Sequence, residues 1–293
     1  MATKRSLATK LGVVAGFERP DAALEQYPTP PELAAHVVHL ADLHGDVDGR
    51  TVIDLGTGTG MLALAAALRG PARVVGLELH GDALATAEAN ERRVAASAPV
   101  HWVRGDATRP PFVSNAFDLV ACQALLVNLP EPAAALDAFV GLSSDRVAAV
   151  EPDNADVSVD STVDSEVDLE RRVRTAYIRG VRTDVAIGDR LERLFREAGL
   201  DSVRTRRHYH RKIVEPPYDR ASLSAAARKA SGAGLADHEA ELRRALTTAE
   251  YDELRAAWRE MGRSVVDAMR EGTYRRVEVV PFDVVVGRVA AGG

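Results

Sequence analysis

The chain has 293 residues, of which 46% are hydrophobic and 27% are charged, as in ordinary globular proteins. No apolar run approaches the roughly 18 residues of a membrane span, so we expect a soluble, cytoplasmic protein. Acidic residues outnumber basic ones by 43 to 37, which argues against a bulk basic surface for duplex nucleic acid. Because Cys122 is the one cysteine, an intramolecular disulfide and a cysteine-rich zinc site are both excluded.

Residues 1–30 are predicted to form an arm that precedes the main domain. Residues 1–17 carry basic but no acidic side chains, and we expect a frayed or helical segment there, with a targeting peptide as the alternative. The segment Tyr27–Pro31 contains three prolines and indicates the start of a helix, because proline fixes φ where the first amides need no partner. Residues 32–43 follow with apolar side chains near helical spacing.

Residues 51–150 alternate between short apolar segments and longer amphipathic ones. The short segments are continuous apolar runs, which is typical of strands that are covered on both faces. Strands that alternate with helices predict a parallel sheet between two layers of helices. The expected strands are 51–55, 73–79, 100–105, 117–122 and 146–150, and the expected helices are 61–69, 82–96 and 132–142.

After residue 150 the pattern predicts a loop, two helices and two long strands. The acidic segment 153–168 is expected to be a surface loop, followed by helices at 168–180 and 189–199 and strands at 202–213 and 275–289. A helical segment, 220–272, separates the two strands and is too long for a turn, so we expect it to cover a site. Residues 31–293 are therefore predicted to be one doubly wound α/β domain with a mostly parallel seven-stranded sheet.

The clearest motif is the segment Val52–Gly60, VIDLGTGTG, in which an apolar strand leads through three glycines into a helix. Gly56, Gly58 and Gly60 let the backbone turn tightly and approach a ligand without a Cβ in the way. A dinucleotide fingerprint would need Gly or Ala at position 61, which is Met, and no Gly-Lys-Ser/Thr follows. Both of those nucleotide-binding loops are therefore excluded.

Acidic residues follow in the next predicted strands. Glu78 lies in the second strand near its end, Asp106 follows the third, and Asp118 belongs to the fourth, whose end is expected to line a crevice. Ligands of open parallel sheets bind at the carboxyl ends of the strands. We therefore expect these side chains and Asp54 to surround one site.

The glycine motif with its upstream acid resembles that of class I methyltransferases that use S-adenosylmethionine (SAM). The resemblance implies that the three loop glycines and Thr57 border the methionine part of SAM. It implies that Asp54 acts either through the loop or on the SAM amino group. Gln123, at the end of the fourth predicted strand, would lie near the methionine end.

The same resemblance implies a place for the adenosine part of SAM. Glu78 would accept hydrogen bonds from the ribose hydroxyls. Leu79 would offer an apolar surface to the adenine, and Asp106 with Ala107 would lie at the adenine edge, where the carboxylate can accept from the amino group. SAM is thus the one cofactor that the sequence implies.

Residues 7–90 resemble archaeal and eukaryotic RNA methylases that act on an adenine amine. The resemblance is carried by Leu24–Pro31, LEQYPTPP, by the helix after it, and by the glycine loop. It implies that Gln26, Tyr27 and Thr29 fold over SAM as a lid. That family also needs Asn-Pro-Pro-Phe after the fourth strand, where this chain has Cys-Gln-Ala-Leu-Leu instead.

Residues 100–215 instead resemble the type 11 methyltransferases, which act mostly on small molecules. The matching segments are GDAxxxPF at 105–112, AFDLV at 116–120, LPEP at 129–132, VEP at 150–152 and the helix before Gly199. We therefore favour a small-molecule methyl acceptor. Methylation of RNA or protein, and SAM binding without catalysis, remain the alternatives, and the oligomeric state stays open.

Methyl transfer from a sulfonium needs alignment more than it needs acid or base catalysis, because the leaving group is neutral. A general base is required only where the acceptor must lose a proton. The candidates for such a base are His208, His210 and Glu151. No third ligand is spaced with the two histidines, so no metal site is expected.

Overall fold

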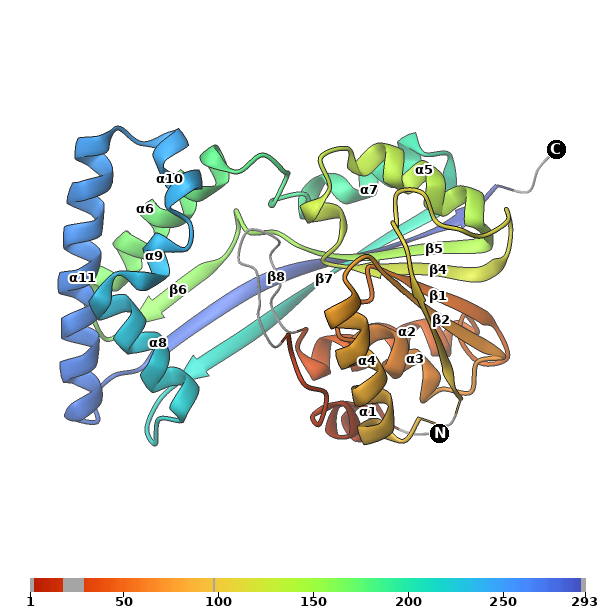
Figure 1. The fold of residues 1–293 in the computed structure, drawn as a ribbon, viewed down its shortest axis with the longest axis horizontal. Helices are drawn as coiled ribbons and strands as arrows, with labels where there is room; N and C mark the ends of the chain where they lie inside the picture. The colour runs from red at the N-terminus through yellow and green to blue at the C-terminus, as the bar shows by residue number, and fades with distance from the viewer. Residues whose placement is uncertain (1–2, 18–28, 97, 291–293) are drawn as a thin grey trace. The chain divides into compact units, whose positions relative to one another are not determined.

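The computed structural model describes residues 3–17, 29–96 and 98–290. Its eight-stranded sheet has the order β3-β2-β1-β4-β5-β8-β6, with β7 paired to β8 (Figure 1). The chain divides into two compact units, the first comprising Met1–Glu151, Ile187–His208 and Phe282–Gly293, the second Pro152–Ala186 and Tyr209–Pro281. Among the described residues, no helix is both long and apolar enough to cross a membrane.

The first unit contains the predicted alternation of strands and helices. The pairs β1–β2, β2–β3, β1–β4 and β4–β5 are all parallel, which confirms the α/β class. The strands are β1 (Thr51–Leu55), β2 (Arg73–Glu78), β3 (Val100–Arg104), β4 (Phe117–Gln123) and β5 (Ser143–Pro152), with parts of β7 (Leu200–Val214) and β8 (Arg276–Val289). The helices are α1 (Lys4–Leu11), α2 (Pro31–Leu43), α3 (Met61–Ala67), α4 (Gly81–Val94), α5 (Pro132–Leu142) and α7 (Gly188–Glu197), with the 3₁₀ turn η2 (Leu126–Asn128).

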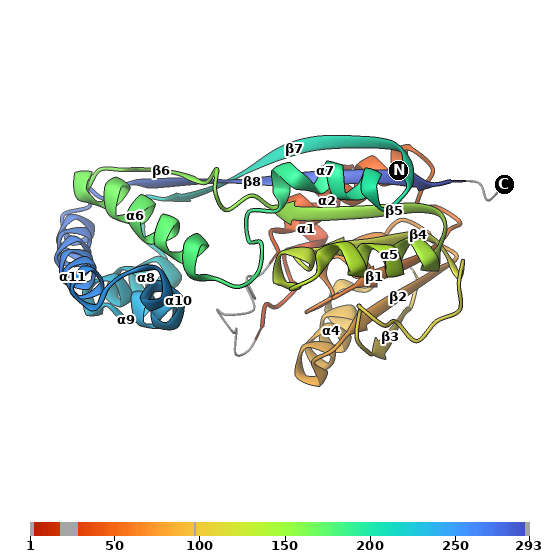
Figure 2. The same cartoon turned by 90° about the horizontal axis from the view of Figure 1, so that it is seen from above.

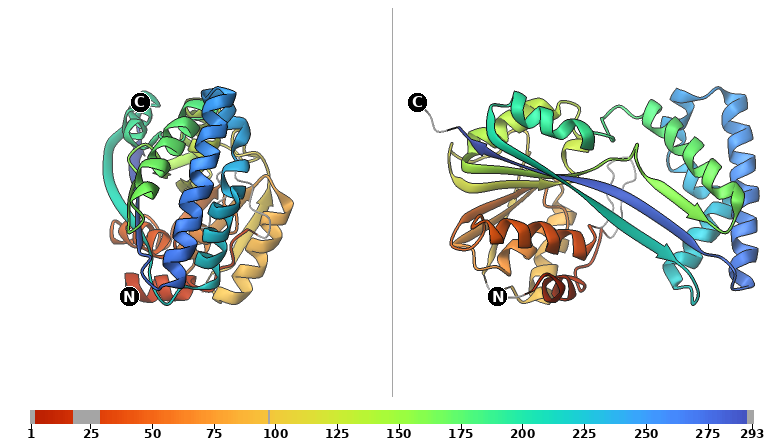
Figure 3. Two further views of the ribbon diagram at one scale, coloured as in Figure 1. Left: turned by 90° about the vertical axis from the view of Figure 1, so that its left-hand side faces the viewer. Right: turned by 180° about the vertical axis from the view of Figure 1, so that it is seen from behind.

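Helices lie on both faces of this sheet (Figure 1, Figure 3). A cluster of buried hydrophobic side chains fills each of these two layers. Val52 of β1 packs in the layer of α1 to α4, whereas the next residue, Ile53, packs in the layer of α5 and α7. Successive strand residues point to opposite faces, so a sheet that is covered twice needs apolar residues at every position. This double burial explains the continuous apolar runs of β1, β2 and β4.

The N-terminal segment takes the helical form that was one of its two predicted alternatives. Thr3 caps α1 by accepting a hydrogen bond from the amide of Ser6 at 3.2 Å. Leu7 and Leu11 are fully buried in the layer that also holds α2 and α3. Burial of two leucines stabilises this attachment by about 2 kcal/mol for each side chain.

The second unit is mainly helical, and one prediction for it was wrong. The segment 153–168 is not a loop throughout, because β6 (Ser158–Ser161) pairs antiparallel with the start of β8 and α6 (Asp164–Gly180) begins soon after. Pairing with β6 gives the start of β8 a hydrogen-bonding partner along an edge that would otherwise be unpaired. This additional strand raises the sheet from the seven predicted strands to eight.

The helical segment predicted between the last two strands is present. It forms α8 (Arg220–Ser231), α9 (Ala233–Ala236), α10 (Glu239–Ala245) and α11 (Thr248–Arg270), and Figure 2 shows the first three beside the long α11. Thr247 and Glu250 form a capping box at the start of α11. A Cβ at Gly262 would lie 2.3 Å from the amide nitrogen of Ala230, so α8 and α11 approach closely only because that residue is glycine.

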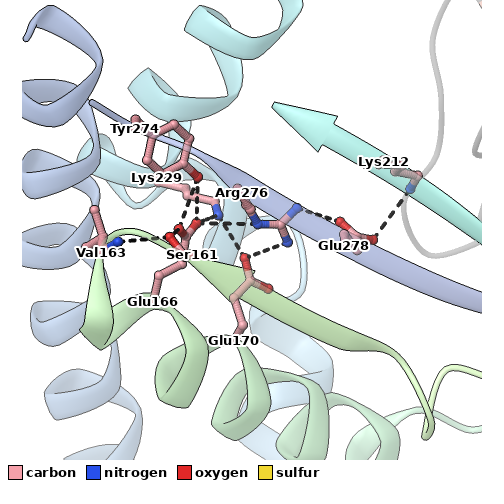
Figure 4. A network of polar contacts seen from close by, with 9 residues as sticks. All are labelled: Ser161, Val163, Glu166, Glu170, Lys212, Lys229, Tyr274, Arg276 and Glu278. Carbon is pink, nitrogen blue, oxygen red and sulfur yellow. Dashed lines mark hydrogen bonds and ion pairs between the residues drawn. The ribbon is translucent and has the colours of Figure 1, made fainter. Parts of the chain in front are cut away.

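A buried carboxylate organises the polar contacts of this second unit (Figure 4). Glu166 of α6 is fully buried and accepts from the hydroxyl of Ser161 at 2.5 Å and from Tyr274 at 3.0 Å. It is also paired with Lys229 and lies 3.5 Å from Nε of Arg276. These contacts join α6, α8, β6 and β8 around the charge of Glu166. A buried charge of this kind is stable only while its partners are present.

We expect Glu166→Ala to lower the free energy of unfolding of the second unit by about 3–5 kcal/mol, because it leaves buried cations and two hydroxyls with fewer partners. Trp258 of α11 reports this unit, and in a Trp102→Phe background it is the remaining tryptophan of the chain. Urea unfolding followed by its fluorescence measures the change. Glu253→Ala, at an exposed ion pair of 3.9 Å with Arg172, is the control and should stay within about 0.5 kcal/mol. Equal effects would contradict the central role of Glu166.

Candidate active site

A cavity of about 280 Å³ opens at the carboxyl ends of the parallel strands of the first unit. This is the place where open parallel sheets bind their ligands. Residues that follow β1, β2 and β3, together with the end of β4 and the turn after it, supply most of its walls. They are Phe17, Thr29, Asp54, Gly56, Thr57, Gly58, Thr59, Met61, Leu62, Leu77, Glu78, Leu79, His80, Gly105, Asp106, Ala107, Gln123, Ala124, Leu125, Asn128 and Leu129.

The loop between β1 and α3 needs its glycines for two reasons. Gly56 and Gly58 have φ values of +66° and +55°, which side chains rarely allow. A Cβ would also lie 2.7 Å from Leu125 at position 56 and 3.0 Å from Phe17 at position 58. The loop and the side chains around it are therefore packed without room for another methyl group.

Gly60 differs from the other two glycines of the motif. It is not among the residues that line the cavity, and a Cβ there would meet Trp102 at 2.8 Å and Ala87 at 3.1 Å. Its φ of +89° starts α3 in a left-handed conformation. The sequence predicted a cofactor contact here, and the structure places the residue in the packing behind the loop instead.

Asp54 holds the loop from inside the protein. Its Oδ2 accepts from the hydroxyl of Thr57 at 2.6 Å and from the amide of Ala63 at 3.1 Å, and the residue is 2% exposed. Burial raises the pKa of its carboxyl to about 7, against the lowering effect of these hydrogen bonds. Two roles were considered for Asp54, and these contacts fit the one in which it supports the loop.

Glu78 ends β2 and joins the loop from the other side. Its Oε2 accepts from the amide of Gly58 at 2.9 Å, and its Oε1 accepts from the amide of His80 at 3.0 Å. The side chain is mostly buried, but the residue lines the cavity, and each oxygen retains acceptor capacity. Leu79, next in the chain, is 53% exposed and offers an apolar surface there.

Asp106 and Ala107 line the cavity after β3, as expected. Oδ1 of Asp106 accepts from both the amide and the hydroxyl of Thr108, at 2.8 and 2.7 Å. These two hydrogen bonds lower the pKa of the carboxyl, so it is ionised at neutral pH. A carboxylate is thereby fixed in orientation in the wall of the cavity.

The side of the cavity next to β4 carries amides and a hydroxyl. Nε2 of Gln123 donates to the hydroxyl of Thr29 at 3.0 Å, while the buried Oε1 of Gln123 has no partner among the described residues. Nδ2 of Asn128 donates to the carbonyl of Ala124 at 3.0 Å. Of the predicted lid residues, Thr29 thus lines the cavity, whereas Gln26 and Tyr27 lie outside the described residues.

Sequence reasoning missed several residues of the cavity wall. Leu125, Asn128 and Leu129 follow β4 in a turn for which the motif of the RNA methylases offered no match. Phe17 belongs to the N-terminal segment and contacts a loop that begins about forty residues later in the chain. Local periodicity contains no signal for such a distant contact.

The three proposed general bases do not line this cavity. Glu151 is fully buried, and its carboxylate accepts from the amides of Leu125, Leu126 and Val127 at 3.0 to 3.3 Å. Burial raises its pKa to about 7, yet the group holds the turn rather than facing the cavity. His208 stacks on His36 with ring centroids 5.0 Å apart, and His210 belongs to the second unit.

The expectation for Asp118 was wrong, because this residue lies at the start of β4 rather than at its end. Its Oδ2 accepts from the amide and hydroxyl of Thr51 at 2.8 and 2.7 Å, at the first residue of β1. In a parallel pair both strand starts lie at the same edge, which is opposite to the cavity. Asp118 therefore caps the other end of the sheet.

Residues 52–142 match the family model described as a methyltransferase domain. This part of the chain is therefore similar to a methyltransferase domain. The matched residues include the loop glycines, Glu78, Asp106 and Gln123, so the cavity lies within the domain except for Phe17 and Thr29.

The names of two curated relatives of this chain describe different kinds of methyl acceptor. The rRNA N(6)-adenosine-methyltransferase Mettl5 of Drosophila melanogaster is 48% identical over 87 residues, 29% of this chain and 41% of the relative. The ubiquinone biosynthesis O-methyltransferase of Neisseria meningitidis serogroup C is 34% identical over 105 residues, 34% of this chain and 42% of the relative. The chain thus spans about two fifths of the length of these relatives.

The fold of the methyltransferase domain is also found in solved structures. A Pyrococcus horikoshii protein, described provisionally as an RNA methyltransferase, aligns over 100% of both chains with a TM-score of 0.52. Its sequence is 18% identical to this chain, so the likeness concerns the fold alone.

Replacing Asp54 by Asn is expected to change how the stability of the methyltransferase domain depends on pH. In the unfolded chain the carboxyl of Asp54 has a pKa of about 4, whereas in the folded protein its pKa is about 7. Between these values only the unfolded wild type releases a proton, so the wild type loses stability relative to Asp54→Asn as the pH rises. The difference should grow by about 1.4 kcal/mol per pH unit and level off above neutrality. Urea titrations of both proteins measure it, and a constant difference would contradict the prediction.

Proposed function

We propose that this chain is an enzyme that binds SAM in the cavity described above and transfers its methyl group to a small molecule. The observation that carries the proposal is that the glycine loop, Glu78 and Asp106 converge on one cavity. The loop allows close approach to its backbone, and the two carboxylates provide acceptors for hydroxyl and amino groups. SAM is a nucleoside joined to an amino acid, so its binding site needs both the close backbone approach and the carboxylate acceptors.

Gly56, Thr57 and Gly58 would border the methionine part of SAM. The buried Oε1 of Gln123 supports this placement, because a carbonyl oxygen without a partner is a ready acceptor for the ammonium group of SAM. Asp54 would act on this end through the loop, since its carboxylate is engaged with Thr57 and Ala63.

Glu78, Leu79 and Asp106 would hold the adenosine part. Each oxygen of Glu78 accepts one backbone amide and has further acceptor capacity for a ribose hydroxyl. The exposed side chain of Leu79 would pack on the adenine. Oδ1 of Asp106 is used by Thr108, which leaves Oδ2 for the adenine amine, with Ala107 beside it.

Bound SAM would supply an electrophilic methyl group, which a lone pair of the acceptor takes as the carbon–sulfur bond breaks and its electrons pass to sulfur. The chain's part is to align the acceptor and exclude water, which contributes up to about 10 kcal/mol in well-oriented reactions. On the β4 side of the cavity, the described lining residues carry amide, hydroxyl and aliphatic groups but no titratable ones. We infer that none of the described residues on this side of the cavity acts as a base on the acceptor.

The turn after β4 favours a small molecule as the acceptor. Leu125 belongs to the segment that stands where the RNA methylases have Asn-Pro-Pro-Phe, and both Leu125 and Leu129 line the cavity after β4. Aliphatic side chains do not offer the flat face on which a nucleobase stacks. RNA is the second candidate, and the identity of 48% to Mettl5 over 87 residues favours it.

The acceptor class can be tested with methyl-labelled SAM. We expect the purified chain to transfer label to the small-molecule fraction of a cell extract, and mass spectrometry before and after incubation identifies the product. Label in a ribonuclease-sensitive fraction would show that the small-molecule proposal is wrong. Stabilisation by SAM without any transfer of label would favour a SAM-binding protein that has no catalytic activity.

The placement of Glu78 can be tested with Glu78→Gln, which retains one acceptor oxygen for the backbone. We expect the affinity for SAM to fall about tenfold, because the amide accepts fewer hydrogen bonds from the ribose. Calorimetry should also compare SAM with an analogue that lacks the ribose 2′-hydroxyl. The analogue should bind more weakly than SAM to the wild type but about equally to the variant. An undiminished difference in the variant would mean that Glu78 serves the loop alone.

A further inference from the structure

Asn90 joins three separate segments of the first unit through one buried side chain. Its Oδ1 accepts from the amide of Ala15 at 2.9 Å, and its Nδ2 donates to the carbonyl of Ala15 at 2.9 Å. Nδ2 also donates to the carbonyl of Thr59 at 3.0 Å, and Arg93 donates to Oδ1 at 2.9 Å. The segment Val13–Phe17 is thereby bound to α4 and to the glycine loop. It is part of the predicted arm of residues 1–30, and from here on we use the word arm for these five residues.

The side chain of Asn90 is fully used by these contacts. An amide has two N–H donors and two acceptor lone pairs, and all four have a partner here. The residue is 0% exposed, on a helix whose other buried positions are Ala83, Leu84, Ala87 and Val94. A polar residue at such a position is unfavourable unless its hydrogen bonds are made. The contacts with Ala15 and Thr59 therefore give this asparagine its stabilising role.

The arm that Asn90 holds carries a wall of the cavity. Phe17 follows Ala15 by two residues, lines the cavity, and lies so close to the loop that a Cβ at Gly58 would be 3.0 Å from its ring. On the other side, Val14 packs against the layer of α1 to α4. The amide of Gly58 in turn donates to Glu78, so the arm, the loop and β2 meet at one residue.

We propose that Asn90 is a positioning residue for SAM, which acts by holding the arm so that Phe17 closes the cavity over Gly58. The inference rests on the proposed function, because it concerns the same cavity. It assigns part of the cofactor site to residues that precede the matched domain, which begins at residue 52. Loss of Asn90 would release both the arm and the carbonyl of Thr59.

The first measurement is hydrogen exchange of the full chain without ligand. In the wild type the amide of Ala15 should be protected, and Asn90→Ala should remove this protection while α4 itself stays protected. Val94→Ala, which shortens a buried side chain of the same helix and removes none of the hydrogen bonds of Asn90, is the control for general destabilisation. Glu88→Ala, on the exposed face of α4, controls for helix substitution.

The second measurement is the affinity for S-adenosylhomocysteine by calorimetry. We expect Asn90→Ala and Phe17→Ala each to weaken binding about tenfold. The double variant should bind at most about twofold more weakly than either single variant. This non-additivity is expected because both changes remove the same wall, and a merely structural role of Asn90 would not produce it. Val94→Ala and Glu88→Ala should bind like the wild type.

The outcomes separate the two proposals. If the wild type binds neither SAM nor S-adenosylhomocysteine, the proposed function fails and this inference fails with it. If the wild type binds and Asn90→Ala binds equally well, the positioning role is wrong while the proposed function stands. Additive losses in the double variant, or unchanged protection of Ala15, would also overturn it.

Discussion

The cavity depends on two buried carboxylates that hold a glycine loop from neighbouring strands. Asp54 at the end of β1 binds Thr57 and Ala63, and Glu78 at the end of β2 binds the amide of Gly58. Backbone donors in a buried loop must be paired. The amide of Thr57 donates to the carbonyl of Leu77 in β2, whereas the amide of Gly58 is paired by the side chain of Glu78. The shape of the loop therefore follows from the pairing of β1 with β2.

A third buried carboxylate sets the opposite wall. Glu151 at the end of β5 binds three amides of the turn that carries Leu125, and Leu125 packs against Gly56. Burial raises the pKa of both Asp54 and Glu151 to about 7, so each is kept at some cost to stability near neutral pH. Asp54 and Glu151 thus support the loop and the turn, whereas Glu78 binds backbone amides and also lines the cavity, as Asp106 does. Perturbed pKa values here mark support for the site rather than catalysis.

Sequence patterns predicted what is encoded locally. Double burial made β1, β2 and β4 continuous apolar runs, and the strand ends then located Glu78, Asp106 and Gln123 around the cavity. The prediction failed where the position of a residue within its strand decides the outcome. Asp118 is the second residue of β4 and lies near the start of the strand, so it is at the edge of the sheet opposite to the cavity. Β6 was missed because its pairing partner lies more than a hundred residues away in the chain.

The contact between the arm and α4 joins two segments that are distant in the sequence, and one feature of the sequence of α4 indicates it. Ala15 and Asn90 are 75 residues apart, and neither belongs to a motif. Asn90 nevertheless falls on the face of α4 that otherwise buries alanine, leucine and valine. A single amide on an apolar helix face must find backbone partners or water. Here the partners come from the arm and the glycine loop, so that one polar residue in an amphipathic pattern links a segment outside the matched domain to the wall of the cavity.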